Sequence, residues 1–211
     1  MKRFLQRHLP TRLSAYGHVL TSHLPLPVRR LPHAAHLIVT WSCNLKCGGC
    51  GAWQRALEEE LSAAQWEEVF SQIPSLDIVK IIGGEPFART DIAAVVNGIR
   101  RAVDPMVLQL VTNGTLTEQI VAFAQDHAWP NLHLRVSLDG LGNTHDRARG
   151  VPGTFDQTMA TLTALAALRQ RRDFQLAVNF TLTDDSLPDM RDLIDRCRTL
   201  GVDVVPGFKV R

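Results

Sequence analysis

The feature that most constrains the fold of this chain is the alternation of short apolar runs with longer stretches of helical periodicity. Short runs rich in β-branched or alternating apolar residues predict strands. These strands are expected at residues 36–41, 78–82, 107–111, 132–138, 174–182 and 202–205. The stretches between them place apolar residues three and four positions apart, which predicts helices. The first helix is expected to begin at a capping box formed by Ser62 and Gln65, with Trp66, Val69 and Phe70 on one face. The other helices are expected at residues 91–103, 118–127, 154–169 and 187–200.

This alternation predicts a parallel sheet, because each helix must carry the chain back before the next strand can run in the same direction. Five strand–helix units and a sixth strand fit a barrel segment or an open doubly wound sheet. We expect an α/β fold of the partial (βα)6 TIM-like barrel class. The sixth strand is followed only by residues 206–211, and an uncovered edge strand is a liability. Either a partner closes the barrel edge or the chain is a fragment of a longer protein. We favour the fragment and expect the C-terminal end to be truncated.

The N-terminal region differs from the rest in charge, so residues 1–32 are expected to be a basic extension and residues 33–211 the core domain. The first 57 residues carry eight Lys or Arg residues and no Asp or Glu. Two interpretations of the extension stay open, contact with a membrane surface or anionic partner and simple packing on the domain, and we favour the second. Neither a signal peptide nor the roughly 18 apolar residues of a spanning helix are recognisable. Export is excluded, a cytoplasmic location is expected, and no nucleic-acid partner is predicted.

Three of the four cysteines lie directly after the first expected strand, at Cys43, Cys47 and Cys50. Thiolates are soft metal ligands, and three in one loop can hold a metal centre together. A structural zinc ion needs four protein ligands, but Cys197 falls on the apolar face of an expected helix and is interpreted as a core residue. Zinc with three ligands and a disulfide with one odd thiol stay open. An iron–sulfur cluster with one open iron fits the chemistry best.

Glycine and polar residues gather immediately after the other expected strands. Gly83–Pro86 follows the second strand, Asn113 the third, and Asp139 the fourth. The carboxyl ends of parallel strands share one face, which is where such folds build their sites. We therefore expect these segments to converge on the cysteine loop.

The cysteine loop, together with Gly83-Gly84-Glu85-Pro86, resembles the radical S-adenosylmethionine superfamily, and the likeness runs from about residue 36 to about residue 205. The resemblance implies that Cys43, Cys47 and Cys50 hold three irons of a [4Fe-4S] cluster and that S-adenosylmethionine chelates the fourth. It also implies reductive cleavage of the cofactor to methionine and a 5′-deoxyadenosyl radical, which abstracts hydrogen from a substrate. An external electron donor of the flavodoxin or ferredoxin type is implied as well.

The same resemblance implies a set of cofactor-binding residues at the strand ends. They are Gly83, Gly84, Glu85, Asn113, Ser137, Asp139, Arg149 and Asn179. Glu85 is expected to bind the cofactor's amino group and Arg149 its carboxylate, a contact that suits a guanidinium fork. Each has a plain structural alternative, such as a solvated glutamate in a turn, a surface arginine or a satisfied strand asparagine.

Two further points concern the neighbourhood of the loop. The residue before the third cysteine is often aromatic in the resembled family, but here it is Gly49, so Trp53 is considered for the adenine contact by proximity. His145 and Asp146 are expected to shape a loop rather than to catalyse, and the run 58–60 of glutamates is expected to be solvated.

The substrate is not identified by the sequence. The segment 145–150 is similar to a loop of SPASM- and twitch-type members, which favours a peptide or protein substrate, while the basic N-terminal region leaves a lipid-linked or anionic substrate open. The competing interpretation is a non-catalytic α/β module that binds a metal or an iron–sulfur cluster for a structural or sensing role. That module would bind metal without cleaving S-adenosylmethionine.

Overall fold

The computed structural model describes residues 32–56 and 59–208 of the chain. Its strands form one parallel sheet in the order β1-β2-β3-β4-β5-β6. They are β1 (Ala34–Ile38), β2 (Ile78–Ile82), β3 (Val107–Thr112), β4 (Leu132–Ser137), β5 (Gln175–Leu182) and β6 (Asp203–Phe208). Each strand pairs with its neighbour in sequence, which confirms the expected parallel α/β sheet and leaves β1 and β6 at its two edges.

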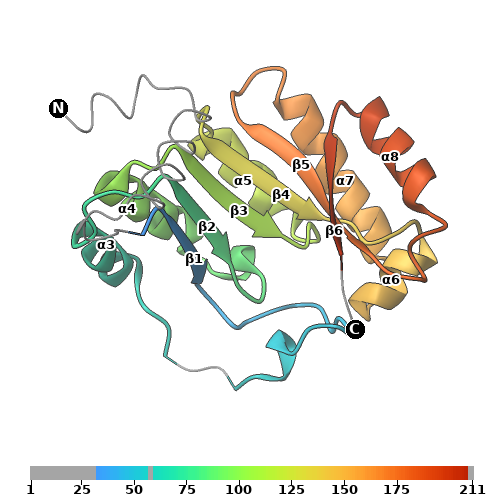
Figure 1. Ribbon diagram of the computed structural model, residues 1–211, viewed down its shortest axis with the longest axis horizontal. Coiled ribbons are helices and arrows are strands. Elements are labelled where there is room, and N and C mark those ends of the chain that lie inside the picture. Colours follow the sequence, from blue (N-terminus) through green and yellow to red (C-terminus); the bar gives the residue numbers. More distant parts are fainter. Residues whose placement is uncertain (1–31, 57–58, 209–211) are drawn as a thin grey trace, which may run out of the picture.

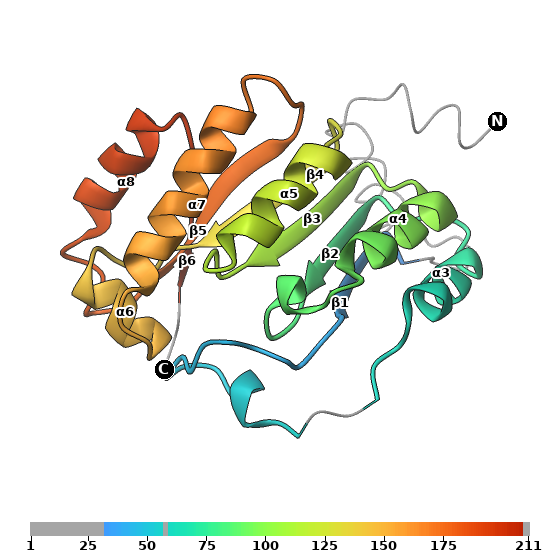
Figure 2. The ribbon, with the colours of Figure 1, turned by 180° about the vertical axis from the view of Figure 1, so that it is seen from behind.

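Helices cover one face of this sheet (Figures 1 and 2). The α-helices are α3 (Ala63–Ser71), α4 (Ile92–Val103), α5 (Thr117–His127), α6 (Asn143–Arg149), α7 (Thr154–Leu168) and α8 (Met190–Thr199), and two short 3-10 helices are η1 (Ala52–Gln54) and η2 (Pro86–Ala88). The predicted capping box starts α3, since the Ser62 hydroxyl accepts from the Gln65 backbone N–H and the Gln65 side chain accepts from that of Ser62.

The hydrophobic core lies between the sheet and its helical layer. In β4, Leu132, Leu134 and Val136 are fully buried toward the helices, whereas the alternate residues His133 and Arg135 are only half-buried. β3 has the same alternation. A closed barrel would bury both faces of every strand. The second face is therefore the open interior of a partial barrel.

The segment Asn143–Arg149 is a helix, so the expectation of a loop there is wrong. Seven residues are too few to show apolar periodicity, and Gly150 ends the helix in a left-handed conformation. Asp146 accepts hydrogen bonds from the backbone N–H groups of Gly153 (2.7 Å) and Phe155 (2.8 Å). It thereby caps the start of α7 from the preceding helix. Burial raises the pKa of its carboxyl, but the hydrogen bonds from Phe155, Gly153 and Thr154 together outweigh burial, and the pKa is lowered.

Three boundaries or faces also differ from expectation. α8 begins at Met190 rather than at residue 187, because residues 183–189 form turns around the buried Ser186. β6 continues to residue 208 through Pro206, which an edge strand tolerates because one side of it needs no ladder donor. Val69 is 42% exposed, so it does not belong to the apolar face of α3.

The proposed division at residue 32 concerns a segment that, apart from Pro32, lies outside the described residues. Within residues 32–56 and 59–208, no helix has the length and hydropathy needed to cross a bilayer.

Candidate cofactor-binding site

A cavity of about 950 Å³ lies at the carboxyl ends of the strands, and Cys43, Cys47 and Cys50 all line it. The loop that carries them follows β1. Cys43 and Cys47 are partly exposed, Cys50 is exposed, and all three are free thiols. The volume is near the upper end of the roughly 300–1,000 Å³ found for ligand pockets, which is room for a nucleoside-sized cofactor.

Most of the residues expected at the cofactor meet at this cavity. Gly83, Gly84, Asn113, Ser137, Asp139 and Arg149 line it. They come from the ends of β2, β3 and β4 and from α6, so the strand ends converge on the cysteine loop. Glu85 and Asn179 are not among the lining residues.

Sequence reasoning missed the wall that the end of β5 contributes. The lining residues there are Thr181, Leu182, Thr183, Asp184, Asp185 and Leu187. They form no recognisable motif, and their one available signal was their position after the fifth expected strand.

Contacts from distant segments shape the cysteine loop. The Lys46 N–H donates to the Arg149 backbone carbonyl (3.1 Å), and the side-chain oxygen Oδ1 of Asn44 accepts from the Asn113 side-chain amide (2.8 Å). Gly150 has a φ of +70°, and a Cβ there would lie 2.3 Å from the Lys46 carbonyl oxygen. The close approach of α6 to the loop therefore requires glycine at this position.

The Gly83-Gly84 pair packs against the backbone that leads into the cysteine loop. The Gly84 N–H donates to the Thr40 carbonyl (2.7 Å), and the next N–H, that of Glu85, donates to the Ser42 carbonyl (2.8 Å). A Cβ on Gly84 would lie 2.2 Å from the Ser42 carbonyl oxygen, and one on Gly83 would lie 2.5 Å from that of Thr40. These glycines thus let the end of β2 lie flush against the loop while they line the cavity.

Glu85 is fully buried and ties the ends of β2 and β3 together. One carboxylate oxygen accepts from the Thr112 hydroxyl (2.8 Å) and the Phe87 N–H (3.1 Å), and the other accepts from the Asn113 N–H (2.7 Å). Burial raises the pKa of Glu85, while these hydrogen bonds and the charge of Arg149 oppose the rise. The structure therefore places Glu85 behind the cavity wall, where it positions Asn113.

An ion pair between Arg149 and Asp139 crosses the cavity wall. Nη2 of Arg149 lies 2.8 Å from Oδ2 of Asp139, and both side chains are largely buried. Nη1 of Arg149 is 4.0 Å from Sγ of Cys47, and its Nε is buried without a hydrogen-bond partner. Oδ1 of Asp139 accepts from the Thr181 N–H (3.0 Å). The guanidinium therefore holds Asp139 through Nη2 while Nη1 lies near Cys47.

His145 is fully buried next to this ion pair. Its Nδ1 accepts from the Asp139 N–H (3.0 Å), so the ring proton is assigned to Nε2, which has no partner. Burial, with the charge of Arg149 adding to it, lowers the pKa of His145 to about 4. A neutral imidazole thus fixes the backbone at Asp139, a role that sequence reasoning missed.

Asn179 and Trp53 stand outside the cavity wall. Asn179 is the register partner of Ser137 on the next strand, and its carbonyl accepts from the Leu138 N–H (2.9 Å). Trp53 is 39% exposed, and its indole N–H donates to the Cys47 carbonyl (3.3 Å). In this geometry Trp53 steadies the cysteine loop.

A clamp on Arg89 holds the return of the loop toward α3. Arg89 forms an ion pair with Glu60 (3.1 Å) and donates to the Val39 carbonyl (2.7 Å). Glu60 also accepts from the Thr40 hydroxyl and the Trp41 N–H. The expectation of a solvated glutamate is therefore wrong for Glu60, because its partner lies 29 residues away.

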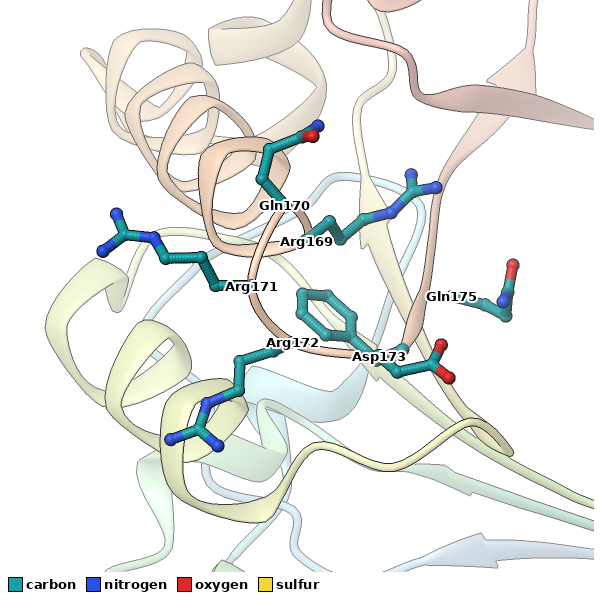
Figure 3. A pocket seen from close by; sticks show the side chains of 7 residues that line it. Arg169, Gln170, Arg171, Arg172, Asp173 and Gln175 are labelled. Carbon is teal, nitrogen blue, oxygen red and sulfur yellow. The ribbon is translucent and has the colours of Figure 1, made fainter.

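A second hollow, of about 380 Å³, lies before β5 at the opposite end of the sheet, in the turn of residues 169–175. Figure 3 shows the side chains of Arg169, Arg171 and Arg172 pointing in different directions. The Arg169 guanidinium donates to the Gly201 carbonyl (3.1 Å). These arginines do not converge on one point, so the cavity at the cysteines is the candidate site.

The donors at the loop fit an iron–sulfur cluster with one open iron. Burial raises the pKa of the Cys43 thiol against a hydrogen bond from Leu45, and metal binding would deprotonate it. Among the described residues, no three His, Cys, Asp or Glu side chains gather tightly enough to hold one ion. Thiolates on different irons of a cluster stand farther apart than thiolates around a single ion. Three thiols from one loop match a cluster with one open iron, whereas a structural zinc ion needs a fourth protein ligand, and Cys197 is buried in the core.

The chain combines a partial parallel α/β barrel with a three-thiol loop at the carboxyl ends of the strands. This combination is typical of a class of iron–sulfur proteins. The chain matches the Radical SAM superfamily over residues 37–197, and it belongs to that family. The family uses a [4Fe-4S] cluster and S-adenosylmethionine.

Individual relatives cover nearly the whole chain. It is 30% identical over 205 residues to Pre-heme d1 synthase of Dinoroseobacter shibae, covering 91% of this chain and 47% of that protein. It is 25% identical over 185 residues to the sporulation killing factor maturation protein SkfB of Bacillus subtilis, covering 81% and 41%. The chain therefore spans about half the length of the curated relatives it matches.

Solved structures show the same fold. Streptococcus suis SuiB bound to S-adenosylmethionine superposes with a TM-score of 0.74 at 19% identity, covering 94% of this chain and 45% of that one. This agreement confirms the partial-barrel fold expected from the strand–helix alternation.

Proposed function

We propose that the protein carrying this chain is a radical S-adenosylmethionine enzyme. The observation that carries the proposal is one cavity lined by Cys43, Cys47 and Cys50 and by the strand-end residues around them. Cluster and cofactor, when bound, supply a 5′-deoxyadenosyl radical that abstracts hydrogen from the substrate. The chain itself holds the cluster, orients the cofactor and limits access of water.

We assign the cofactor contacts from the cavity wall. Arg149 binds the cofactor's carboxylate through its guanidinium while Asp139 holds Nη2. Gly83 and Gly84 present backbone groups to the amino group, and Asn113 and Ser137 face the adenosyl part. Glu85 acts as a positioning residue through Asn113, and Asn179 supports Ser137 from the neighbouring strand.

The test is anaerobic reconstitution of the full-length protein with iron and sulfide, followed by reduction and measurement of 5′-deoxyadenosine. Wild type is expected to form it, and Cys47→Ala is expected to abolish it. Cys197→Ala is the matched control, because Cys197 is buried in the core beyond the cavity and should leave product formation intact. A protein that binds a cluster but forms no 5′-deoxyadenosine would instead support the non-catalytic iron–sulfur module.

The substrate and partners belong to the same proposal. The name of SkfB supports a peptide substrate, and the name of Pre-heme d1 synthase supports a tetrapyrrole. An external flavodoxin- or ferredoxin-like protein supplies the electron, because the described residues offer only the three clustered cysteines and one buried thiol. Free thiols suit the reducing cytoplasm, where we place the protein.

A further inference from the structure

The sheet face opposite the helical layer carries basic side chains just below the cavity. Lys80 is in register with Gln109, which is in register with His133, so these three form a row across β2, β3 and β4. Arg135 stands one row closer to the carboxyl ends, beside its register partner Val111. Strand alternation puts all of them on the half-buried inner face.

This basic row is continuous with the candidate site. Val111, the register partner of Arg135, lines the cavity, and so does Ile82 on β2. Ser137, two residues beyond Arg135 on the same face of β4, lines it too. Arg135 therefore adjoins two residues that line the cavity, although it is not itself one of the lining residues.

The positive charge of Arg135 is poorly compensated. Its Nη1 is buried and has no hydrogen-bond partner, and no ion pair joins Arg135 to any described residue. Asp203 attracts it from β6, two strands away, but only at a distance. Burial lowers the pKa of Arg135, and burial together with the charge of Arg135 lowers that of His133. A guanidinium nitrogen buried without a partner is costly, which suits a site completed by an anion.

We propose that Arg135, with His133 and Lys80, binds a carboxylate of the substrate, and that the substrate is a carboxylated tetrapyrrole. The inference rests on the proposed function, since it deepens the same site. The guanidinium matches a carboxylate in geometry, the neutral His133 donates one hydrogen bond, and Lys80 adds charge. A propionate bound by Arg135 leaves the rest of the ring system in the cavity. The 30% identity to Pre-heme d1 synthase favours a tetrapyrrole over a peptide.

The experiment compares two probes that share one ring system and differ in whether their carboxylates are free or esterified. Coproporphyrin III has four carboxylates, and its tetramethyl ester has none. Binding of each to the full-length protein is followed by the porphyrin absorption band in one low-detergent buffer. Wild type is expected to bind the acid at least about tenfold more tightly than the ester, and Arg135→Met should remove about tenfold to hundredfold of the acid's affinity, as for one charged hydrogen-bonded contact.

Two further variants make the result specific. Arg135→Lys should keep part of the preference for the acid, because it keeps the charge. Arg171→Met, on the exposed turn of Figure 3, should bind the acid as wild type does. The proposal is overturned if acid and ester bind equally, if Arg135→Met binds the acid like wild type, or if a glutamate-rich peptide displaces the acid competitively at lower concentration. None of these readouts needs 5′-deoxyadenosine, so failure of the proposed function is seen separately.

Discussion

Replacing Gly84 with alanine tests how tightly the end of β2 must lie against the cysteine loop. The new Cβ would lie 2.2 Å from the Ser42 carbonyl oxygen and 2.7 Å from that of Trp41, whereas ordinary contact begins at 3.4 Å. Both neighbours are backbone, so the two segments must part by about 1 Å or more. That movement also strains the hydrogen bond from the Gly84 N–H to the Thr40 carbonyl (2.7 Å).

Overpacking costs about 1–3 kcal/mol, and a clash with backbone belongs at the upper end of that range. For a chain of this size, about 3 kcal/mol corresponds to a melting temperature roughly 6–12 °C lower. The assay is thermal unfolding by circular dichroism, with iron content after anaerobic reconstitution as a second readout that should also fall. Gly48→Ala is the matched control, because a Cβ there meets no atom within 4 Å. If Gly84→Ala melts and loads iron as wild type and Gly48→Ala do, the close packing of β2 on the loop is not what the glycine provides.

Two further predictions concern the buried charges. Burial raises the pKa of Glu85, so the folded chain binds the carboxyl proton more tightly than the unfolded chain does. The stability that this proton contributes is present at acid pH and is lost as the pH rises above the carboxyl's ordinary pKa. In Glu85→Gln the melting temperature should no longer show this loss of stability between about pH 4 and pH 8. If the melting temperature of the variant depends on pH as that of wild type does, Glu85 is not the group responsible. Arg149→Met leaves the Asp139 carboxylate buried without its ion-pair partner and should cost about 3 kcal/mol in denaturant unfolding. It should also weaken S-adenosylmethionine binding by at least about tenfold in equilibrium titration, and a double-mutant cycle with Asp139→Asn that shows no coupling would refute the pair.

The parallel sheet was predictable because its signal is local and repeated. The runs at 78–82 and 132–138 mark β2 and β4 to within one residue at each end, since each apolar run is bounded by turn-forming residues. The cysteine spacing and the Gly-Gly pair also lie in continuous sequence. Their convergence followed from the rule that carboxyl ends of parallel strands share a face.

The remaining parts of the site depend on partners far away in the chain. Nothing beside Glu85 in sequence indicates that Thr112 and Asn113 occupy both of its carboxylate oxygens. The clamp between Arg89 and Glu60 and the helix α6 escaped prediction for the same reason, since tertiary contacts stabilise them. The cysteine and Gly-Gly-Glu motifs thus predicted the chemistry of the site, but they did not predict which distant residues its side chains contact.

The anchoring of the cysteine loop also sets an order on folding. The loop is held by Asn113 from the end of β3 and by the Arg149 carbonyl from the end of α6, contacts that span 69 residues and about a hundred residues respectively. Contacts of such sequence separation form late, because the intervening chain must first be organised. A nascent chain that has emerged only as far as β2 already contains all three thiols but lacks both anchors. Under the proposed function, we therefore expect cluster insertion to follow the docking of β4 and α6, with the three thiols kept reduced until then.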